Sequence, residues 1–170
     1  MTTTLTIRPV EERDAAAVAR IYNEGIEDRV ATFETELRSA EDRLQVIRDS
    51  KDKYAFVVAE LDGQVVGWAS TSPYRSRPCY RGVAEFSVYV GREARGRGVG
   101  RPLMHGLIAE AEAMGFWKLV SRVFPENQAS RSLLNRMGFR EVGVYEKHGQ
   151  LDGVWKDCVI VERLIPSNQP

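Results

Sequence analysis

The sequence predicts an α+β fold built on a mixed sheet, and the order of its segments is the first reason. Strand and helix patterns alternate along the chain as strand, helix, helix, three strands, helix, strand, helix and two strands. Length is the second reason, because 170 residues suit one domain with a real core. We expect a single domain over residues 1–166 and a frayed tail over residues 167–170.

The composition is that of a soluble globular protein. Hydrophobic residues make up 43% of the chain and charged residues 28%. Lysine plus arginine equal aspartate plus glutamate at 24 each, so we expect no nucleic-acid partner. No apolar run approaches the length that spans a bilayer, so we expect no membrane partner.

The two cysteines, Cys79 and Cys158, have no near partner in the sequence. We therefore expect no disulfide framework and no metal site, which fits a reducing compartment. The N-terminus lacks the basic start and apolar core of a signal peptide. These features together predict a cytoplasmic protein.

The first half of the chain holds a strand, two helices and a hairpin. Apolar residues at helical spacing predict the helices, and a serine at position 39 caps the second one. Asp62-Gly63 is a strong hairpin signal. The expected elements are a strand at Leu5–Val10, helices at Asp14–Ile26 and Ala40–Asp49, and strands at Tyr54–Leu61 and Gln64–Ser72.

The second half begins after a proline-containing loop at Pro73–Arg81. Alternation of apolar and polar residues and glycine stops define its elements. They are a strand at Val83–Val90, a helix ending near Gly115, a strand at Phe116–Phe124, a helix at Asn127–Met137, and strands at Phe139–Tyr145 and Val154–Leu164.

A glycine-rich turn between the strand ending at Val90 and the following helix is the most informative stretch. Its glycines allow a sharp bend and a close approach of backbone N–H groups to a ligand. The free N–H groups at the start of the next helix favour phosphate oxygens, and neighbouring arginines add charged contacts. The residues concerned are Arg95, Gly96, Arg97, Gly98, Val99, Gly100 and Arg101.

The spacing of this turn distinguishes between phosphate ligands. A Rossmann turn requires glycine where Arg101 stands, and a Walker loop requires Gly-Lys followed by Ser or Thr. The pattern Arg-x-x-Gly-x-Gly, formed by Arg95, Gly98 and Gly100, resembles the pyrophosphate loop of the GNAT superfamily of N-acetyltransferases, which bind acetyl-CoA. The alternative is an ordinary strand-to-helix loop with solvated arginines.

Glu85 is the candidate general base for acyl transfer to an amine. It lies in the middle of a strand, on the same face as Ser87 and Tyr89, among apolar neighbours. Such a setting raises the pKa of a carboxyl group towards the range useful for catalysis. The alternative is a glutamate that pairs with an arginine on a solvated face.

Two further groups of residues have both a binding and a plain structural interpretation. Arg75 and Arg77, between two prolines, suit an anionic substrate or are a charged surface loop. Asn127 and Ser130 suit contacts with a cofactor or serve as helix caps. His148 is expected on the turn between the last two strands, either as a plain exposed residue or as one that touches the substrate.

The likeness to one group within this superfamily covers nearly the whole chain. The segments Ile21–Asn23, Arg29–Glu34, Ala84–Val90 and Gly153–Asp157 are similar to those of phosphinothricin and methionine sulfoximine N-acetyltransferases. Gly82–Val90 and Phe116–Phe124 most resemble the arsinothricin N-acetyltransferase branch.

The resemblance implies a GNAT fold, with a twisted, mostly antiparallel sheet of about seven strands and about four flanking helices. It implies acetyl-CoA as donor, the α-amino group of a glutamate analogue as acceptor, resistance to that antimetabolite, and a homodimer. It assigns Glu85 as general base, backbone groups of Val88 and Val90 to pantetheine, the turn to the pyrophosphate, and Asn127 to the cofactor arm. It assigns the acceptor's acidic groups and pocket to Arg75, Arg77, Phe33 and Tyr80.

One departure from the superfamily pattern concerns the general acid. Many acetyltransferases have a tyrosine in the helix after Asn127, whereas this chain has Leu133 and Leu134 there. The general acid is therefore unassigned. Two other functions stay open on the sequence: transfer to another amine, such as a polyamine, an aminoglycoside or a protein N-terminus, and a non-catalytic acyl-CoA sensor.

Overall fold

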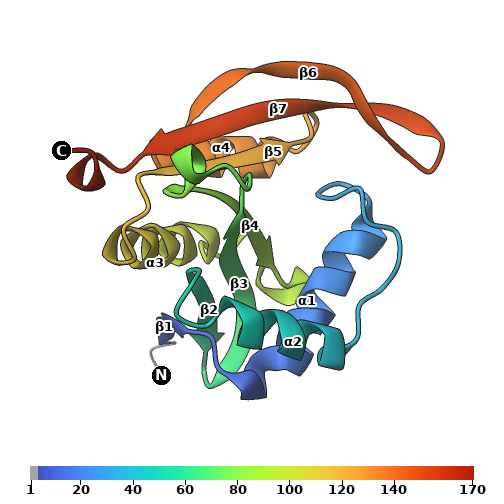
Figure 1. Cartoon of the computed structure of the whole chain (residues 1–170). Helices are drawn as coiled ribbons and strands as arrows, with labels where there is room; N and C mark the ends of the chain where they lie inside the picture. The colour runs from blue at the N-terminus through green and yellow to red at the C-terminus, as the bar shows by residue number, and fades with distance from the viewer. Residues whose placement is uncertain (1–3) are drawn as a thin grey trace.

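A single seven-stranded sheet forms the centre of the computed structural model, which describes residues 4–170 (Figure 1). The strand order is β1-β2-β3-β4-β5-β7-β6, and every neighbouring pair is antiparallel except β4 and β5. The predicted α+β class with a mixed, mostly antiparallel sheet is therefore confirmed. The strands are β1 (Leu5–Pro9), β2 (Phe56–Leu61), β3 (Gln64–Pro73), β4 (Val83–Val90), β5 (Lys118–Val123), β6 (Arg140–Leu151) and β7 (Val154–Leu164).

Two pairs of α-helices cover the two faces of this sheet. Helices α1 and α2 pack on one face through a cluster that includes Val18, Ile47 and Trp68. Helices α3 and α4 pack on the other through Leu107 and Leu134 (Figure 1). Between residues 4 and 170, no helix combines the length and the apolar character needed to cross a membrane. The helices are α1 (Ala15–Asp28), α2 (Ala40–Ser50), α3 (Gly100–Ala113) and α4 (Gln128–Arg136).

The parallel pair of strands is short, and this decides where the sheet opens. β4 and β5 pair only at Val83 with Lys118, Ala84 with Leu119, and Glu85 with Val120. Beyond Glu85, β4 continues for five residues beside β3 alone. The sheet therefore splits between β4 and β5 directly after Glu85.

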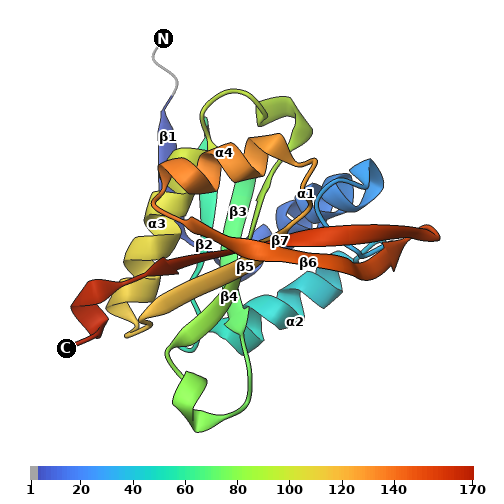
Figure 2. The same ribbon diagram turned by 90° about the horizontal axis from the view of Figure 1, so that it is seen from above.

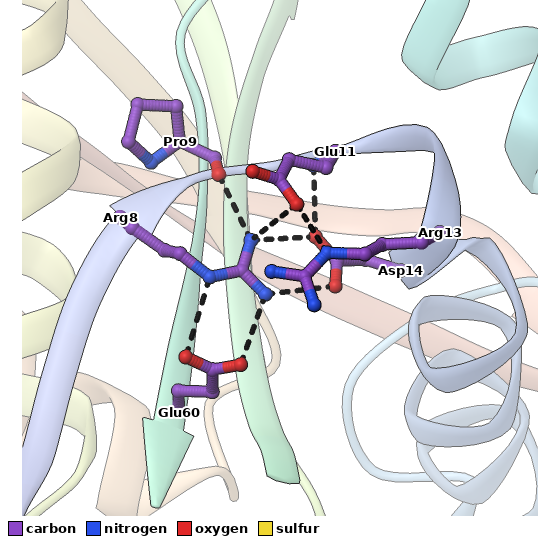
Figure 3. A network of polar contacts seen from close by, with 6 residues as sticks. All are labelled: Arg8, Pro9, Glu11, Arg13, Asp14 and Glu60. Carbon is purple, nitrogen blue, oxygen red and sulfur yellow. Dashed lines mark hydrogen bonds and ion pairs between the residues drawn. The ribbon is translucent and has the colours of Figure 1, made fainter. Parts of the chain in front are cut away.

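A network of ionic hydrogen bonds fastens the start of the chain to the sheet (Figure 3). The Arg8 guanidinium donates to Asp14 Oδ1 and Oδ2 at 2.9 and 2.8 Å, and to Glu60 on β2 at 3.2 Å. The Glu11 backbone N–H donates to Asp14 Oδ2 at 2.8 Å. The network joins β1, β2 and the turn that leads into α1.

The C-terminal hairpin differs from the prediction in length. β6 extends to Leu151, because the turn is formed by Asp152 and Gly153, both at positive φ. His148 therefore lies within β6 and not on the turn, so its predicted position was wrong. The two bulges in β6 explain the error, because they interrupt the regular alternation that a strand shows in sequence.

The chain end is held against the body of the protein, whereas the sequence predicted a frayed tail. Pro166–Asn168 form a short 3₁₀ turn. The Asn168 side chain donates to the backbone carbonyls of Glu112 and Phe116 at 2.8 Å, and Ser167 Oγ donates to Glu112 Oε1 at 2.6 Å. Specific side-chain contacts of this kind leave no signal in a composition rich in proline and polar residues.

Candidate active site

The split between β4 and β5 forms a cleft that runs through the sheet. Its walls come from the diverging halves of the two strands, from α4 and from the segment after α1. Apolar and polar side chains share the lining, which suits a long ligand with an amide-containing arm. The lining residues are Ala31, Phe86, Ser87, Val88, Tyr89, Ser121, Arg122, Val123, Asn127, Ser130 and Leu134.

The backbone of β4 turns unpaired groups towards this cleft. Ser121 Oγ donates to the Phe86 carbonyl at 2.9 Å, and Arg95 Nε donates to the Val90 carbonyl at 3.1 Å. Alternate residues of a strand point their backbone groups to the same side. Val88 therefore presents its N–H and C=O to the cleft, while the Val90 carbonyl already has a partner.

The glycine-rich turn leads directly from this cleft into α3. Gly96 and Gly98 have φ of 74° and 75°, and nothing lies within 4 Å of the position that a Cβ would take at either residue. α3 begins at Gly100, so the free N–H groups of its first turn lie next to these glycines. Val99 is buried in the core, so only its backbone is available to a ligand. The residues present fit a pyrophosphate group.

The three arginines of the turn have different surroundings. Arg95 pairs with Asp28 at 2.6 Å, so its guanidinium braces the turn against α1. Hydrogen bonds from Arg92 and Arg95 hold the pKa of Asp28 below its usual value. Arg97 and Arg101 are exposed and make no ion pair in the part of the chain that the structure describes. These two arginines, and not Arg95, have free guanidinium groups for a ligand.

Glu85 is the last residue of β4 that pairs with β5, and the two strands separate directly after it. Its side chain is 33% exposed and its Oε1 lies 3.4 Å from Arg122 Nη2. The apolar setting expected from the strand pattern is therefore wrong. Ala84 and Phe86 point to the opposite face of the sheet, into the α3 core, while the Glu85 carboxylate faces a cation.

Arg122 and His148 are the residues beside Glu85 that sequence reasoning did not place there. Arg122 Nη1 lies 3.4 Å from His148 Nε2. An arginine inside the apolar segment Leu119–Phe124 was a signal, but its partner depends on the pairing of β4 with β5. The position of His148 depends on the bulges of β6.

α4 supplies one wall of the cleft and is capped at its start. Asn127 Oδ1 accepts from the Ser130 N–H at 3.2 Å, and Asn127 Nδ2 donates to the Val30 carbonyl at 3.3 Å. The helix-cap interpretation therefore holds for Asn127, and both residues also line the cleft. Leu134 is buried in the wall, at 2% exposure, and supplies no acid.

Phe33 lies on the segment after α1 and packs at the end of β5. Its ring packs edge-on against Phe124 with centroids 4.9 Å apart. A Cβ at Gly149 would come within 2.9 Å of the ring, so the close approach requires glycine there. Arg29 pairs with Asp152 at 2.8 Å, which joins the segment carrying Phe33 to the tip of the β6–β7 hairpin (Figure 2).

Arg75, Arg77 and Tyr80 lie on the loop between β3 and β4. The loop starts near Glu85 in the sheet, because Ser72 pairs with Glu85. The Arg75 guanidinium lies 5.2 Å from the centre of the Tyr74 ring, which packs edge-on against Tyr80. The structure shows no contact between this loop and Glu85 among the described residues.

Comparison with known proteins identifies the family. The model of the acetyltransferase (GNAT) family matches residues 18–139. The chain belongs to this family. The chain is therefore an enzyme, an N-acetyltransferase of the GNAT type.

Two acetyltransferases of known name match almost the entire length of this chain. Phosphinothricin N-acetyltransferase of Alcaligenes faecalis is 36% identical over 165 residues, 93% of this chain and 81% of that protein. The L-methionine sulfoximine/L-methionine sulfone acetyltransferase of Pseudomonas aeruginosa is 32% identical over 158 residues, 92% of each chain.

Solved structures of known acetyltransferases are similar to this chain in both fold and sequence. A phosphinothricin acetyltransferase from Sinorhizobium meliloti in complex with acetyl-CoA has a TM-score of 0.86 and 31% identity, covering 95% of this chain and 89% of that one. A ribosomal-protein-alanine N-acetyltransferase from Brucella melitensis has a TM-score of 0.90 and 36% identity, covering 94% and 99%.

Proposed function

We propose that this enzyme transfers acetyl from acetyl-CoA to the α-amino group of a glutamate-analogue antimetabolite and so confers resistance. The candidate acceptors are phosphinothricin, methionine sulfoximine and arsinothricin. One observation carries the proposal: Glu85 stands where β4 and β5 separate, beside a cleft lined by Ser87, Val88 and Arg122. The candidate proton acceptor and the candidate anion site thus lie at opposite ends of the part of β4 that does not pair with β5.

The residues that would hold acetyl-CoA follow from the fit described above. The N–H groups of Gly96, Gly98 and Gly100 and the guanidinium groups of Arg97 and Arg101 suit the pyrophosphate. The unpaired backbone groups of Val88 suit the pantetheine arm. When bound, acetyl-CoA supplies an acetyl thioester, which the acceptor amine converts to an amide with release of a thiolate. The related Sinorhizobium enzyme was solved with this co-substrate.

Glu85 would take the proton that the amine must lose. An α-ammonium group has no lone pair for attack, so its proton must leave before or during bond formation. A carboxylate at the cleft mouth accepts this proton directly or through one water. We assign no general acid, because α4 offers Leu134 at the cleft wall and a thiolate is a fair leaving group without protonation.

The acceptor class rests on the chemistry around Glu85 and on the relatives. Two relatives act on phosphinothricin and on methionine sulfoximine, which are amino acids with a polar side-chain head. Arg75 and Arg77 would bind that head, and Phe33 and Tyr80 would line its pocket. Cations around the site favour an anionic acceptor over a polyamine or an aminoglycoside.

A turnover screen tests this proposal. Thiol release from acetyl-CoA is measured with phosphinothricin, methionine sulfoximine, arsinothricin, spermidine and a peptide with an N-terminal alanine. We expect kcat/KM for at least one glutamate analogue to exceed that for spermidine and the peptide by about 100-fold. Glu85→Gln should bind acetyl-CoA normally and lose about 100-fold or more in kcat.

The outcomes separate the rival functions. Preference for the peptide would replace the proposal with protein N-terminal acetylation, the activity named for the Brucella relative. Preference for spermidine would indicate a polyamine acetyltransferase. Acetyl-CoA binding without thiol release for any amine would indicate a sensor, and unchanged turnover in Glu85→Gln would remove this residue as the base.

We also propose that the enzyme is a homodimer. Among the described residues, six of the nine exposed large apolar side chains lie on β6 and β7. β6 is an edge strand, so its backbone groups are open to a second copy. The six residues are Val142, Val144, Tyr145, Val154, Trp155 and Leu164.

A further inference from the structure

Arg122 shares a sheet face with Glu85 and lies beside it where β4 and β5 separate. Val120 pairs with Glu85 across β4 and β5, and Arg122 is two residues further along β5, so it points to the same side. Its Nη2 lies 3.4 Å from Glu85 Oε1. Arg122 also lines the cleft, next to Ser87 and Ser121.

The hydrogen-bonding capacity of Arg122 is largely unused. Its contacts with Glu85 and His148 are both 3.4 Å long, and its side chain is 48% exposed. Elsewhere in the chain, Arg131 grips Glu141 with two bonds of 2.8 and 3.0 Å. A guanidinium group has five N–H donors in a planar fork. Most of the Arg122 donors therefore remain available at the mouth of the cleft.

His148 restrains the direction of this guanidinium. Arg122 Nη1 lies 3.4 Å from His148 Nε2, so the histidine ring limits where this guanidinium can turn. The ring of Tyr145 lies 4.9 Å from that of His148, which limits its rotation. His148 is thus a positioning residue that holds Arg122 beside Glu85.

Glu85 and Arg122 together mirror the charges of a free α-amino acid. The ammonium and carboxylate groups of an α-amino acid are separated by one carbon atom, so their charges are as close as those of this pair. We propose that Arg122 is the specificity-determining residue that binds the α-carboxylate of the acceptor, and so delivers the amino group to Glu85. This inference rests on the proposed function and names the feature of the acceptor that the enzyme requires.

In this assignment, different arginines bind different acidic groups of the acceptor. Arg75 and Arg77 lie on the loop before β4 and would bind the acid of the acceptor's side chain. Arg122 lies on β5, at the cleft itself, and would bind the acid next to the reacting nitrogen. Phosphinothricin and arsinothricin have both acids, and methionine sulfoximine has the α-carboxylate with a polar, uncharged side-chain head. A polyamine has neither acid, and a protein N-terminus has no free α-carboxylate.

The test compares each acceptor with its α-carboxamide, which keeps the amine and the side chain but loses the α-carboxylate charge. kcat/KM is measured for phosphinothricin, methionine sulfoximine and their two amides. The α-amide has a more acidic ammonium group, but this difference cancels when the acid-to-amide ratio of a variant is divided by that of the wild type.

We expect Arg122→Ala to lower kcat/KM for the acids about 100-fold and for the amides less than about 3-fold. Arg122→Lys should recover part of the loss, because it restores the charge without the fork. Arg75→Ala should lower acid and amide alike. Arg48→Ala removes a surface arginine on α2 that pairs with Glu12, and should change neither ratio nor rate.

Equal losses for acid and amide in Arg122→Ala would overturn the inference, because Arg122 would then act through Glu85. An unchanged rate for the acids would overturn it as well, because Arg122 would lie outside the acceptor site. Failure of the proposed function would be seen earlier and separately, as a wild-type enzyme that acetylates neither amino acid. Circular dichroism melting of each variant separates these outcomes from a failure to fold.

Discussion

Asp14 is a buried charged residue, 4% exposed, and its position shows how single side chains anchor this fold. Burial alone would raise the pKa of its carboxyl group. The hydrogen bonds from Arg8 and from the Glu11 N–H outweigh burial and hold this pKa below its usual value. The carboxylate form is therefore the one that the folded state stabilises.

Asp14→Asn should lower the free energy of unfolding at pH 7 by about 1–3 kcal/mol, since charged hydrogen bonds to Arg8 are lost. A depressed pKa stabilises the fold above the unfolded-state value of about 3.9, and this contribution disappears as the pH falls towards the folded-state pKa. Urea unfolding at pH 7 and pH 3 should show a difference between variant and wild type that shrinks at pH 3.

Glu12→Gln is the matched control for this comparison, because it removes a surface ion pair with Arg48. It should change the free energy of unfolding by less than about 0.5 kcal/mol at either pH. An Asp14→Asn deficit that is equally large at both pH values would refute the ionic account of this anchor.

At the scale of elements, the turn before α3 combines a backbone that only glycine adopts freely with an open surface. Gly96 and Gly98 have the positive φ that side chains avoid, and the space beside their Cα atoms is empty. Both glycines therefore leave room for a ligand to approach the backbone of the turn. Gly100 differs, because a Cβ there would meet Leu133 of α4 at 2.9 Å.

Gly98→Ala should weaken acetyl-CoA binding about 10-fold or more, because the added methyl group occupies the approach to the turn. Gly63→Ala provides the control, since Gly63 has φ of 80° and equally open surroundings in the β2–β3 hairpin. Both variants should lose about 1 kcal/mol of stability, whereas only Gly98→Ala should raise the Kd in calorimetry. If Gly98→Ala and Gly63→Ala had the same Kd for acetyl-CoA, the turn would be excluded from the binding site.

The elements also show which parts of the site the sequence could predict. The glycine turn and the alternation of β4 are local patterns, and both were recognised without a structure. The environment of Glu85 was not, because Arg122 is 37 residues away and reaches it only through the pairing of β4 with β5. Pairing between distant strands depends on the whole sheet, which periodicity along one strand does not reveal.

At the scale of the molecule, the β6–β7 hairpin is the part that the monomer leaves uncovered. It extends past the rest of the sheet, and Arg29 and Asp152 tie its tip to the end of α1 (Figures 1 and 2). Trp155 and Val154 near that tip are 55% and 57% exposed. Clustered apolar residues on an edge hairpin indicate a surface for association.

Trp155→Asp should convert a dimer into a monomer, because a buried unpaired charge opposes association. Light scattering after gel filtration should give twice the chain mass of 19.2 kDa for the wild type and that mass for the variant. Val46→Asp changes an exposed side chain on α2, away from the hairpin, and should leave the dimer intact. A monomeric wild type would remove the dimer from the account.

The central claim is spatial: acetyl-CoA lies along the part of β4 that does not pair with β5, with its diphosphate at the glycine-rich turn and its acetyl group at Glu85. A crystal structure of the protein with acetyl-CoA measures this directly. The account predicts phosphate oxygens about 3 Å from the N–H groups of Gly96–Gly100 and the acetyl group beside Glu85. Phosphates bound away from that turn, or a thioester directed away from Glu85, would contradict it.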